Sequence, residues 1–199
     1  MQLPSSLHQF RLRRGFLGAV VALPLGRSVH AQALPAAPRD TQVKAAFLHK
    51  FASFVEWPTA AFPRPETPLR IGVLGDEQLW RDLSELARDR DRDGRPVTVV
   101  RLSPGDSLGG FHVLYLKASS PGRIADLLGY VPEGTLTVAD SDGAHPRGSV
   151  LSFFLEEGRV RFGASQEAAA RQKLRLSSRL LAVARVVRGP DDHEDDAFA

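Results

Sequence analysis

Apolar side chains of the segment VKAAFLHKFASFVEWP, residues 43–58, recur at the spacing of a helix. The side chains that share one helical face, separated by three or four residues, include Phe47, Phe51 and Phe54. Three phenylalanines on one face predict a surface that is buried in the core. Pro58 disfavours helical dihedral angles at the residue before it, so we expect the helix to end near Glu56.

Short apolar runs and amphipathic segments alternate over the next part of the chain. The expected strands cover residues 69–74, 96–100, 112–116 and 136–138, and the expected helices cover residues 78–88 and 121–130. Apolar strands that are separated by helices favour a mostly parallel sheet with helices on both faces.

The pattern changes after residue 140. Two apolar runs, residues 150–155 and 159–162, flank Glu-Glu-Gly and predict an antiparallel hairpin. Two final helices are expected at 166–172 and 177–187, and the second of them directs Leu180, Leu181, Ala184 and Val187 inward. The predicted fold class is therefore α/β, with a single domain, a mostly parallel mixed sheet, helices on both faces and a C-terminal antiparallel hairpin.

The first 33 residues have the order of a secretory signal. Four arginines and no acid accompany an apolar run from Gly15 to Leu25, which is too short to span a bilayer. Arg13-Arg14-Gly15-Phe16-Leu17 fits the twin-arginine pattern, and small residues predict cleavage after Ala31 or Ala33. We therefore expect a periplasmic protein.

Removal of the signal changes the charge and the class of partner. The chain has 26 basic and 23 acidic residues, and loss of the four signal arginines leaves a charge near −1, which argues against nucleic acid as a partner. No second long apolar run follows, so no transmembrane segment is expected in the mature chain. Residues 34–40 predict a flexible leader, residues 41–188 the α/β domain and residues 189–199 a disordered acidic tail.

Candidate catalytic and metal sites are weak. Cysteine is absent, which excludes disulfide and thiol chemistry. Asp76 follows a strand and is expected to cap the next helix, without the glycines of a dinucleotide site. Residues 140–143 resemble the start of a calcium loop that lacks its closing acid, and His49, His112 and His145 lack metal-site spacing. We predict no catalytic residue, cofactor or metal.

Arginine is the more informative residue type. Alternation places Arg159 and Arg161 on one face of the hairpin's second strand, whereas Arg175 and Arg179 flank the start of the last helix. The candidate binding residues, which would suit a carboxylate, a phosphate or an acidic partner if these elements adjoin, are Trp57, Arg159, Arg161, Arg175, Ser177, Ser178 and Arg179. The alternatives are a solvated arginine face, a tryptophan at the edge of the core and serines that cap the helix.

Several segments resemble the YfiR-like family of small periplasmic proteins. The first helix is similar to the family's VKAAFLYNFAKFVEWP, and residues 157–162, 167–171 and 174–181 are similar to its ending DGRVRFEINLAAARRAGLKISSKLLRLA. The strand segments 71–76 and 112–116 also match, so the resemblance covers most of residues 41–187. Relatives often carry a cysteine where Phe111 stands, and Gly163-Ala164-Ser165 replaces Glu-Ile-Asn. Disulfide-based control therefore cannot operate here.

The resemblance implies a regulatory binding protein. Such relatives bind the periplasmic sensor region of an inner-membrane diguanylate cyclase and hold it inactive, often as homodimers. Two other classes remain open from the residues, a periplasmic solute-binding or accessory protein and a hydrolase whose site is not recognisable. Binding of a small ligand would raise the melting temperature of the first, and loss of turnover on changing Ser178 would support the second.

Overall fold

The computed structural model describes residues 39–88, 95–140 and 145–188. The predicted signal at 1–33, most of the predicted leader and the predicted tail at 189–199 lie outside the described residues, as do residues 141–143 of the calcium-like segment.

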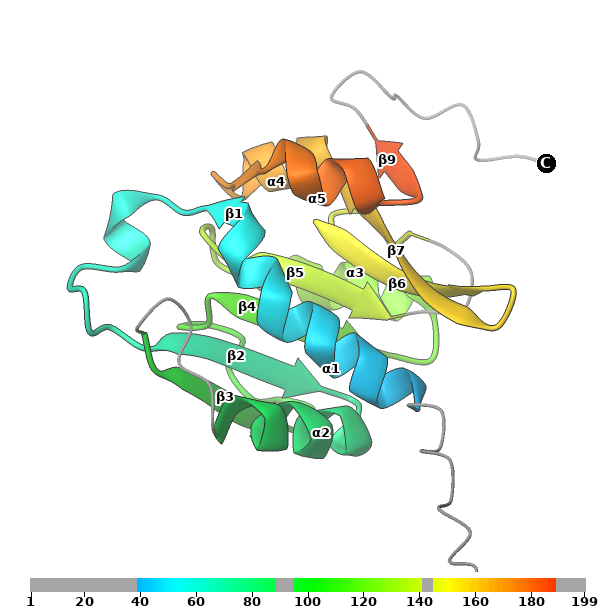
Figure 1. The fold of residues 1–199 in the computed structure, drawn as a ribbon, viewed down its shortest axis with the longest axis horizontal. Coiled ribbons are helices and arrows are strands. Elements are labelled where there is room, and N and C mark those ends of the chain that lie inside the picture. Colours follow the sequence, from blue (N-terminus) through cyan, green and yellow to red (C-terminus); the bar gives the residue numbers. More distant parts are fainter. Residues whose placement is uncertain (1–38, 89–94, 141–144, 189–199) are drawn as a thin grey trace, which may run out of the picture. The chain divides into compact units, whose positions relative to one another are not determined.

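A seven-stranded mixed sheet forms the centre of the domain (Figure 1). Its strands are Leu69–Leu74 (β2), Val97–Leu102 (β3), Val113–Lys117 (β4), Leu136–Asp140 (β5), Leu151–Glu156 (β6), Arg159–Ser165 (β7) and Val186–Arg188 (β9). In the order β3-β2-β4-β5-β6-β7-β9 the first five strands are parallel, β6 and β7 form the predicted antiparallel hairpin, and β9 is parallel to β7.

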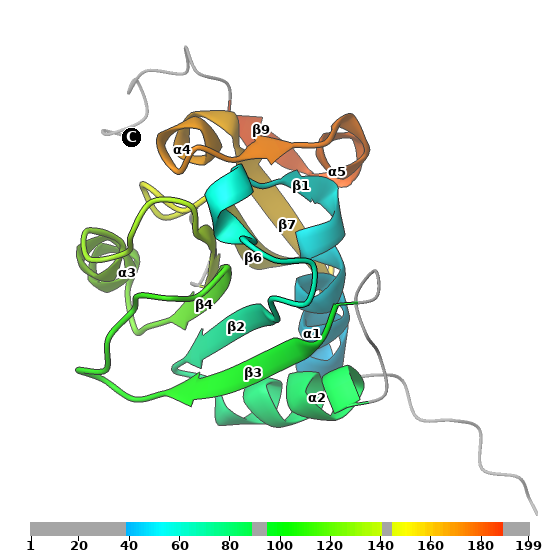
Figure 2. The ribbon, with the colours of Figure 1, turned by 90° about the vertical axis from the view of Figure 1, so that its left-hand side faces the viewer.

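Helices cover both faces of this sheet, which confirms the predicted fold class. The helices α1 (Asp40–Phe51) and α2 (Glu77–Arg88) pack on one face, and α3 (Pro121–Leu128) lies on the other (Figures 1 and 2). Each face has its own group of buried apolar side chains: Ile71 and Val113 belong to the group on the α1 face, and Leu114 packs in the same group as Ile124 of α3. Val113 and Leu114 are neighbours in β4, and their side chains point to opposite faces of the sheet, as the pleat of a strand requires.

The phenylalanine face of α1 packs on the core, as its spacing predicts. Phe51 is 1 % exposed, and Phe47 and Phe54 are partly buried against the same cluster. The Phe51 ring lies 5.8 Å from that of Phe153 in β6 and 5.0 Å from that of Phe162 in β7. These contacts attach the first helix to the hairpin at the far end of the chain.

The first helix ends earlier than expected. It stops at Phe51, continues as a 3-10 turn over Ala52–Phe54, and becomes the short strand β1 (Val55–Glu56) before a second 3-10 turn, Thr59–Ala61. The prediction of helix up to Glu56 is wrong because β1 pairs with β8 (Arg175–Leu176), a partner more than one hundred residues away in the sequence.

The C-terminal helix is also shorter than predicted. After α4 (Gln166–Arg171) and β8, helix α5 covers only Ser178–Val183, and Ala184 is extended. The expected helix through residue 187 is wrong there, because the chain pairs with β7 as β9. Consecutive valines at 186 and 187 favour a strand over a helix.

Candidate functional site

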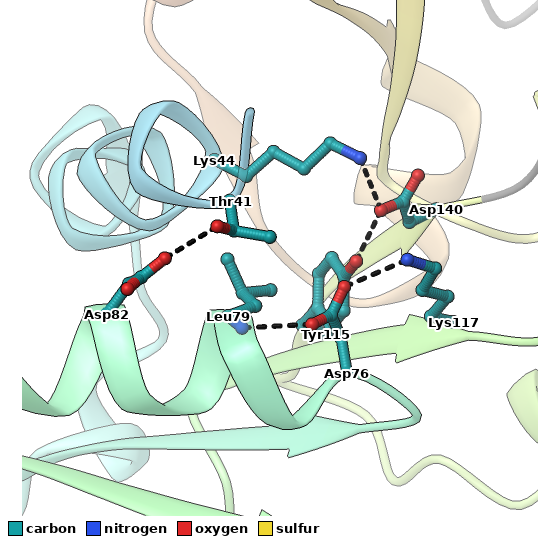
Figure 3. A network of polar contacts seen from close by, with 8 residues as sticks. All are labelled: Thr41, Lys44, Asp76, Leu79, Asp82, Tyr115, Lys117 and Asp140. Atoms are coloured by element: carbon teal, nitrogen blue, oxygen red, sulfur yellow. Dashed lines mark hydrogen bonds and ion pairs between the residues drawn. The ribbon is translucent and has the colours of Figure 1, made fainter. Parts of the chain in front are cut away.

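The carboxyl ends of β2, β4 and β5 hold a network of charged side chains (Figure 3). The chain passes from β2 to β3 on one side and then to β4 on the other, so these ends lie at a switch point, where α/β sheets commonly bind ligands. Gly75 makes the close turn after β2, with φ of 86°, and a Cβ there would lie 2.1 Å from the carbonyl oxygen of Lys117.

Asp76 occupies the start of α2 and confirms the predicted cap. Its Oδ1 accepts the Leu79 backbone N–H at 2.9 Å, and its Oδ2 accepts from the Lys117 Nζ at 2.9 Å. Burial alone would raise the pKa of Asp76, but the Leu79 N–H and the Lys117 ammonium outweigh it and hold that pKa below its ordinary value. This carboxylate is fully occupied by structural contacts.

Lys44 and Asp140 form a buried ion pair beside it. The Lys44 Nζ donates to the Asp140 Oδ2 at 2.6 Å, and each side chain is 11 % exposed. The Tyr115 hydroxyl donates to the same carboxylate oxygen, and burial together with the Asp140 charge raises the pKa of Tyr115. Three elements, α1, β4 and β5, are joined through one carboxylate.

Sequence reasoning missed this network. Lys44 and Asp140 are 96 residues apart, and the calcium-like segment that begins at Asp140 gave no indication of a lysine partner. The only available signal was a lysine next to the apolar face of a helix and an aspartate directly after a buried strand. Each charged group has partners in the protein, so we interpret the network as structural. It holds α1, β4 and β5 together at the switch point.

The amino end of the sheet carries an aromatic cluster around Trp57. Trp57 is partly buried, donates its indole N–H to the Ala52 carbonyl at 3.1 Å, and meets the rings of Phe62 and His112 edge-on. In Figure 1 the strand β1, which directly precedes Trp57, lies at the end of the sheet opposite the arrowheads of β2 and β5. Trp57 is thus both an edge of the core and part of the surface.

His112 lies at the centre of this cluster. Its ring stacks on Phe62 with 4.3 Å between centroids, and the Arg95 guanidinium lies 4.2 Å from the Phe62 centroid. The neighbouring Phe111 is 7 % exposed and lies below the Arg70 guanidinium, 5.0 Å from the ring centroid. Aromatic rings and guanidinium groups therefore pack at the amino end of the sheet, whereas charged pairs lie at its carboxyl end.

The β1–β8 ladder brings two of the predicted residues together. Glu56 is paired with Arg175, whose Nε lies 3.4 Å from the carboxylate, and both side chains are largely exposed. Trp57 follows Glu56 directly, so its backbone lies one residue beyond the ladder position of Arg175. A motif search could not find this pairing, because strands of two residues leave no periodic signal.

The predicted serines have different roles. Ser177 is the N-cap of α5 and its hydroxyl accepts from the Leu180 N–H at 3.3 Å, so it is occupied by the cap. Ser178 and Arg179 are exposed in the first turn of that helix. Arg179 lies beyond the end of the β1–β8 ladder at which the Ser177 N–H bonds to the Phe54 carbonyl. We define the amino-end surface as Glu56, Trp57, Arg175 and Arg179.

The two remaining arginines belong to the hairpin. Arg159 is exposed and paired in register with Glu156, and the Nε of Arg161 lies 3.6 Å from the Glu156 carboxylate. Arg185 contacts the same carboxylate at 2.8 Å. The structure thus divides the predicted arginines into a hairpin group around Glu156 and the amino-end surface.

A serine and a histidine do meet in the structure, at a place that sequence reasoning did not select. The His145 Nδ1 lies 2.5 Å from the Ser152 Oγ, and its Nε2 lies 2.9 Å from the Ser149 carbonyl. Ser152 is only 2 % exposed, so a substrate has no access to this hydroxyl. These contacts fix the segment before β6.

Metal and membrane features are absent from the part of the chain that the structure describes. Within residues 39–88, 95–140 and 145–188, no group of three or more histidine, aspartate or glutamate side chains is placed to hold a metal ion. The helices of the same ranges are too short or too polar to cross a membrane.

Comparison with known proteins adds one finding. The sequence model of the family described as YfiR/HmsC-like matches residues 41–185, nearly the whole of the described domain. Among curated proteins none matches the chain. Because the match covers well over half of the sequence, this chain belongs to the YfiR/HmsC-like family.

Proposed function

We propose that this protein is a periplasmic regulatory binding protein that represses an inner-membrane diguanylate cyclase by binding its periplasmic sensor region. The observation that carries this proposal is the family match over residues 41–185. The charged groups at the switch point, which would be the first place to look for a reaction, are paired with one another. Association, and not turnover, is therefore the function that the geometry supports best.

We propose the amino-end surface as the contact region. Tryptophan and arginine are the residue types in which the binding energy of interfaces concentrates. Trp57 directly follows Glu56, the ladder partner of Arg175, and Arg179 lies in the helix that follows β8. The ion pair between Glu56 and Arg175 is exposed and weak, so a partner carboxylate could replace Glu56 at little cost.

Arg175→Ala tests this region with little risk to folding. If Arg175 is a hot spot, the variant should bind the cyclase sensor region at least about fivefold more weakly, since one kcal/mol corresponds to about that factor. The matched control is Arg81→Ala, because Arg81 is also an exposed arginine paired with a glutamate, on α2. Equal losses for both variants would show a general charge effect and contradict the assignment.

The cellular experiment tests the function itself. Deletion of the gene should raise cyclic di-GMP, and wild-type protein should restore the original level, whereas Arg175→Ala should restore it only in part. If deletion leaves cyclic di-GMP unchanged and a pull-down recovers no cyclase, the repressor proposal is wrong. If Arg175→Ala represses fully, the function stands and the assignment of this surface does not. Arg159→Ala and Arg161→Ala then test the hairpin group.

A further inference from the structure

Both ring nitrogens of His112 are engaged by the backbone of other segments. The Nδ1 accepts the backbone N–H of Arg70, at the start of β2, at 3.0 Å. The Nε2 lies 2.9 Å from the carbonyl oxygen of Ala61, in the 3-10 turn after β1. A backbone N–H can only donate and a carbonyl can only accept, so this geometry requires a neutral ring with its proton on Nε2.

The surroundings of His112 also oppose a second proton. The charged groups that act on the ring are Arg70 from β2 and Arg95 just before β3, and both are cations. Burial first, and then these two guanidinium groups, hold the pKa of His112 below its ordinary value against the opposing effect of the Ala61 carbonyl. Phe62 and Trp57, which cover the ring, contribute no charge.

We propose that His112 is a pH-sensitive latch whose protonation releases residues 57–62 from the amino end of the sheet. A proton on Nδ1 would point at the Arg70 N–H, so that two donors face each other and the hydrogen bond is lost. The resulting imidazolium would lie beside two guanidinium groups. The Ala61 carbonyl and the rings of Phe62 and Trp57 all contact this ring, and they would move when it is released.

The direction of the pH effect follows from the lowered pKa. A released His112 has its ordinary pKa of about 6.5, so the open state binds the proton more readily than the closed one. The closed state is therefore fully favoured above that pH, and its advantage is lost as the pH falls through the pKa of the closed state. Opening should increase about tenfold for each unit by which the closed pKa lies below the open one.

A pH-dependent change in cyclase binding would follow only if the proposed function is correct, whereas the latch itself does not depend on that function. Trp57 belongs to the amino-end surface, so its release would alter that surface and weaken binding of the cyclase at acidic pH. Histidine is the side chain whose charge changes between about pH 5 and 8, which makes such a response possible without any ligand.

The experiment uses the mature protein in a Trp80→Phe background, so that Trp57 is the only tryptophan. Between about pH 8 and 5, Trp57 emission should shift to longer wavelength in a one-proton transition, and exchange of the Arg70 amide should accelerate beyond its intrinsic pH dependence. His112→Gln retains an acceptor and a donor but does not titrate, and should abolish the transition. The matched control is His145→Gln, another partly buried histidine with two hydrogen-bonded ring nitrogens, and it should leave the transition intact.

A second measurement does not depend on how His112→Gln folds. Nitrogen NMR of the unmodified side chain should show the Nε2–H tautomer of His112 and a pKa below about 6.5. The latch is wrong if His112 titrates at or above that value, if the Trp57 transition survives in His112→Gln, or if it disappears in His145→Gln. If Trp57 shows the transition but the protein binds no cyclase at any pH, the proposed function is wrong and the latch stands. If the protein binds the cyclase independently of pH and Trp57 shows no transition, the latch is wrong and the proposed function stands.

Discussion

The two ends of the parallel sheet hold charged groups in opposite ways. At the carboxyl end Lys44 and Asp140 are each 11 % exposed, whereas at the amino end Arg175 and Glu56 are 84 % and 69 % exposed. Burial of Lys44 and Asp140 costs hydration free energy, which their short contact and the hydrogen bond from the Tyr115 hydroxyl offset. The exposed pair stays hydrated, so its contact has no comparable loss to offset. The first arrangement closes a site, and the second leaves charges free to change partners.

The largest effect is expected in the core on which both ends rest. Phe51→Ala removes a buried ring that packs on Phe153 and Phe162, and should lower the free energy of unfolding by about 3 to 5 kcal/mol in chemical denaturation. Val183→Ala, at an exposed position of α5, is the control and should stay within about 0.5 kcal/mol. A loss below about 1 kcal/mol for Phe51→Ala would place that helix face at the surface.

The carboxyl end should respond strongly to the loss of one charge. Lys44→Met leaves the Asp140 carboxylate buried without its lysine partner while the Tyr115 hydroxyl still donates to it, and should cost about 3 kcal/mol of unfolding free energy. The double variant Lys44→Met, Asp140→Asn removes both charges and keeps an acceptor for Tyr115, so it should be more stable than Lys44→Met alone. If the double variant is the less stable of the two, the buried charge is not the source of the loss.

Asp76 should give a smaller and pH-dependent effect. Asp76→Ala removes the cap of α2 and the partner of Lys117, and should cost about 1 to 2 kcal/mol at neutral pH. Because the pKa of Asp76 is lowered in the folded state, this contribution is present above the ordinary value of 3.8 and is lost as the pH falls through the folded pKa. Acid titration of both proteins should show their stabilities converge, and a constant difference would contradict the ionic part.

The smallest effect is expected at the amino end. Arg175→Ala breaks an exposed ion pair with Glu56 and should change the free energy of unfolding by less than about 1 kcal/mol, with a difference that shrinks as salt is added. Paired denaturation curves at low and high salt measure this. A loss comparable to that of Lys44→Met would mean that the two ends do not differ in the way their exposure indicates.

The sequence was sufficient where a pattern repeats within one element. The phenylalanine face of α1, the apolar strands and the hairpin all follow from local periodicity, and the Asp76 cap follows from the end of a strand. The strands β1, β8 and β9 contain two or three residues, so they have no period, and they exist only because a distant strand supplies the hydrogen bonds.

The candidate site was predictable to a lesser degree. Trp57 and Arg175 could be selected by residue type, but their proximity depends on the pairing of Glu56 with Arg175, which no local signal announces. The Lys44–Asp140 pair and the contacts of His112 with Arg70 and Ala61 likewise join residues that are dozens of positions apart. The role of the predicted arginines in partner binding stays a prediction, which Arg175→Ala tests directly.

Phe111 has a consequence for how the protein is made. It fills, below the Arg70 guanidinium, a position where relatives often carry a cysteine, and the whole chain contains no cysteine. With no thiol in the sequence, no part of the fold depends on a bond that only an oxidising compartment could form. The domain can therefore fold under reducing conditions as well as oxidising ones, and bacterial production should require neither an oxidant nor a disulfide isomerase.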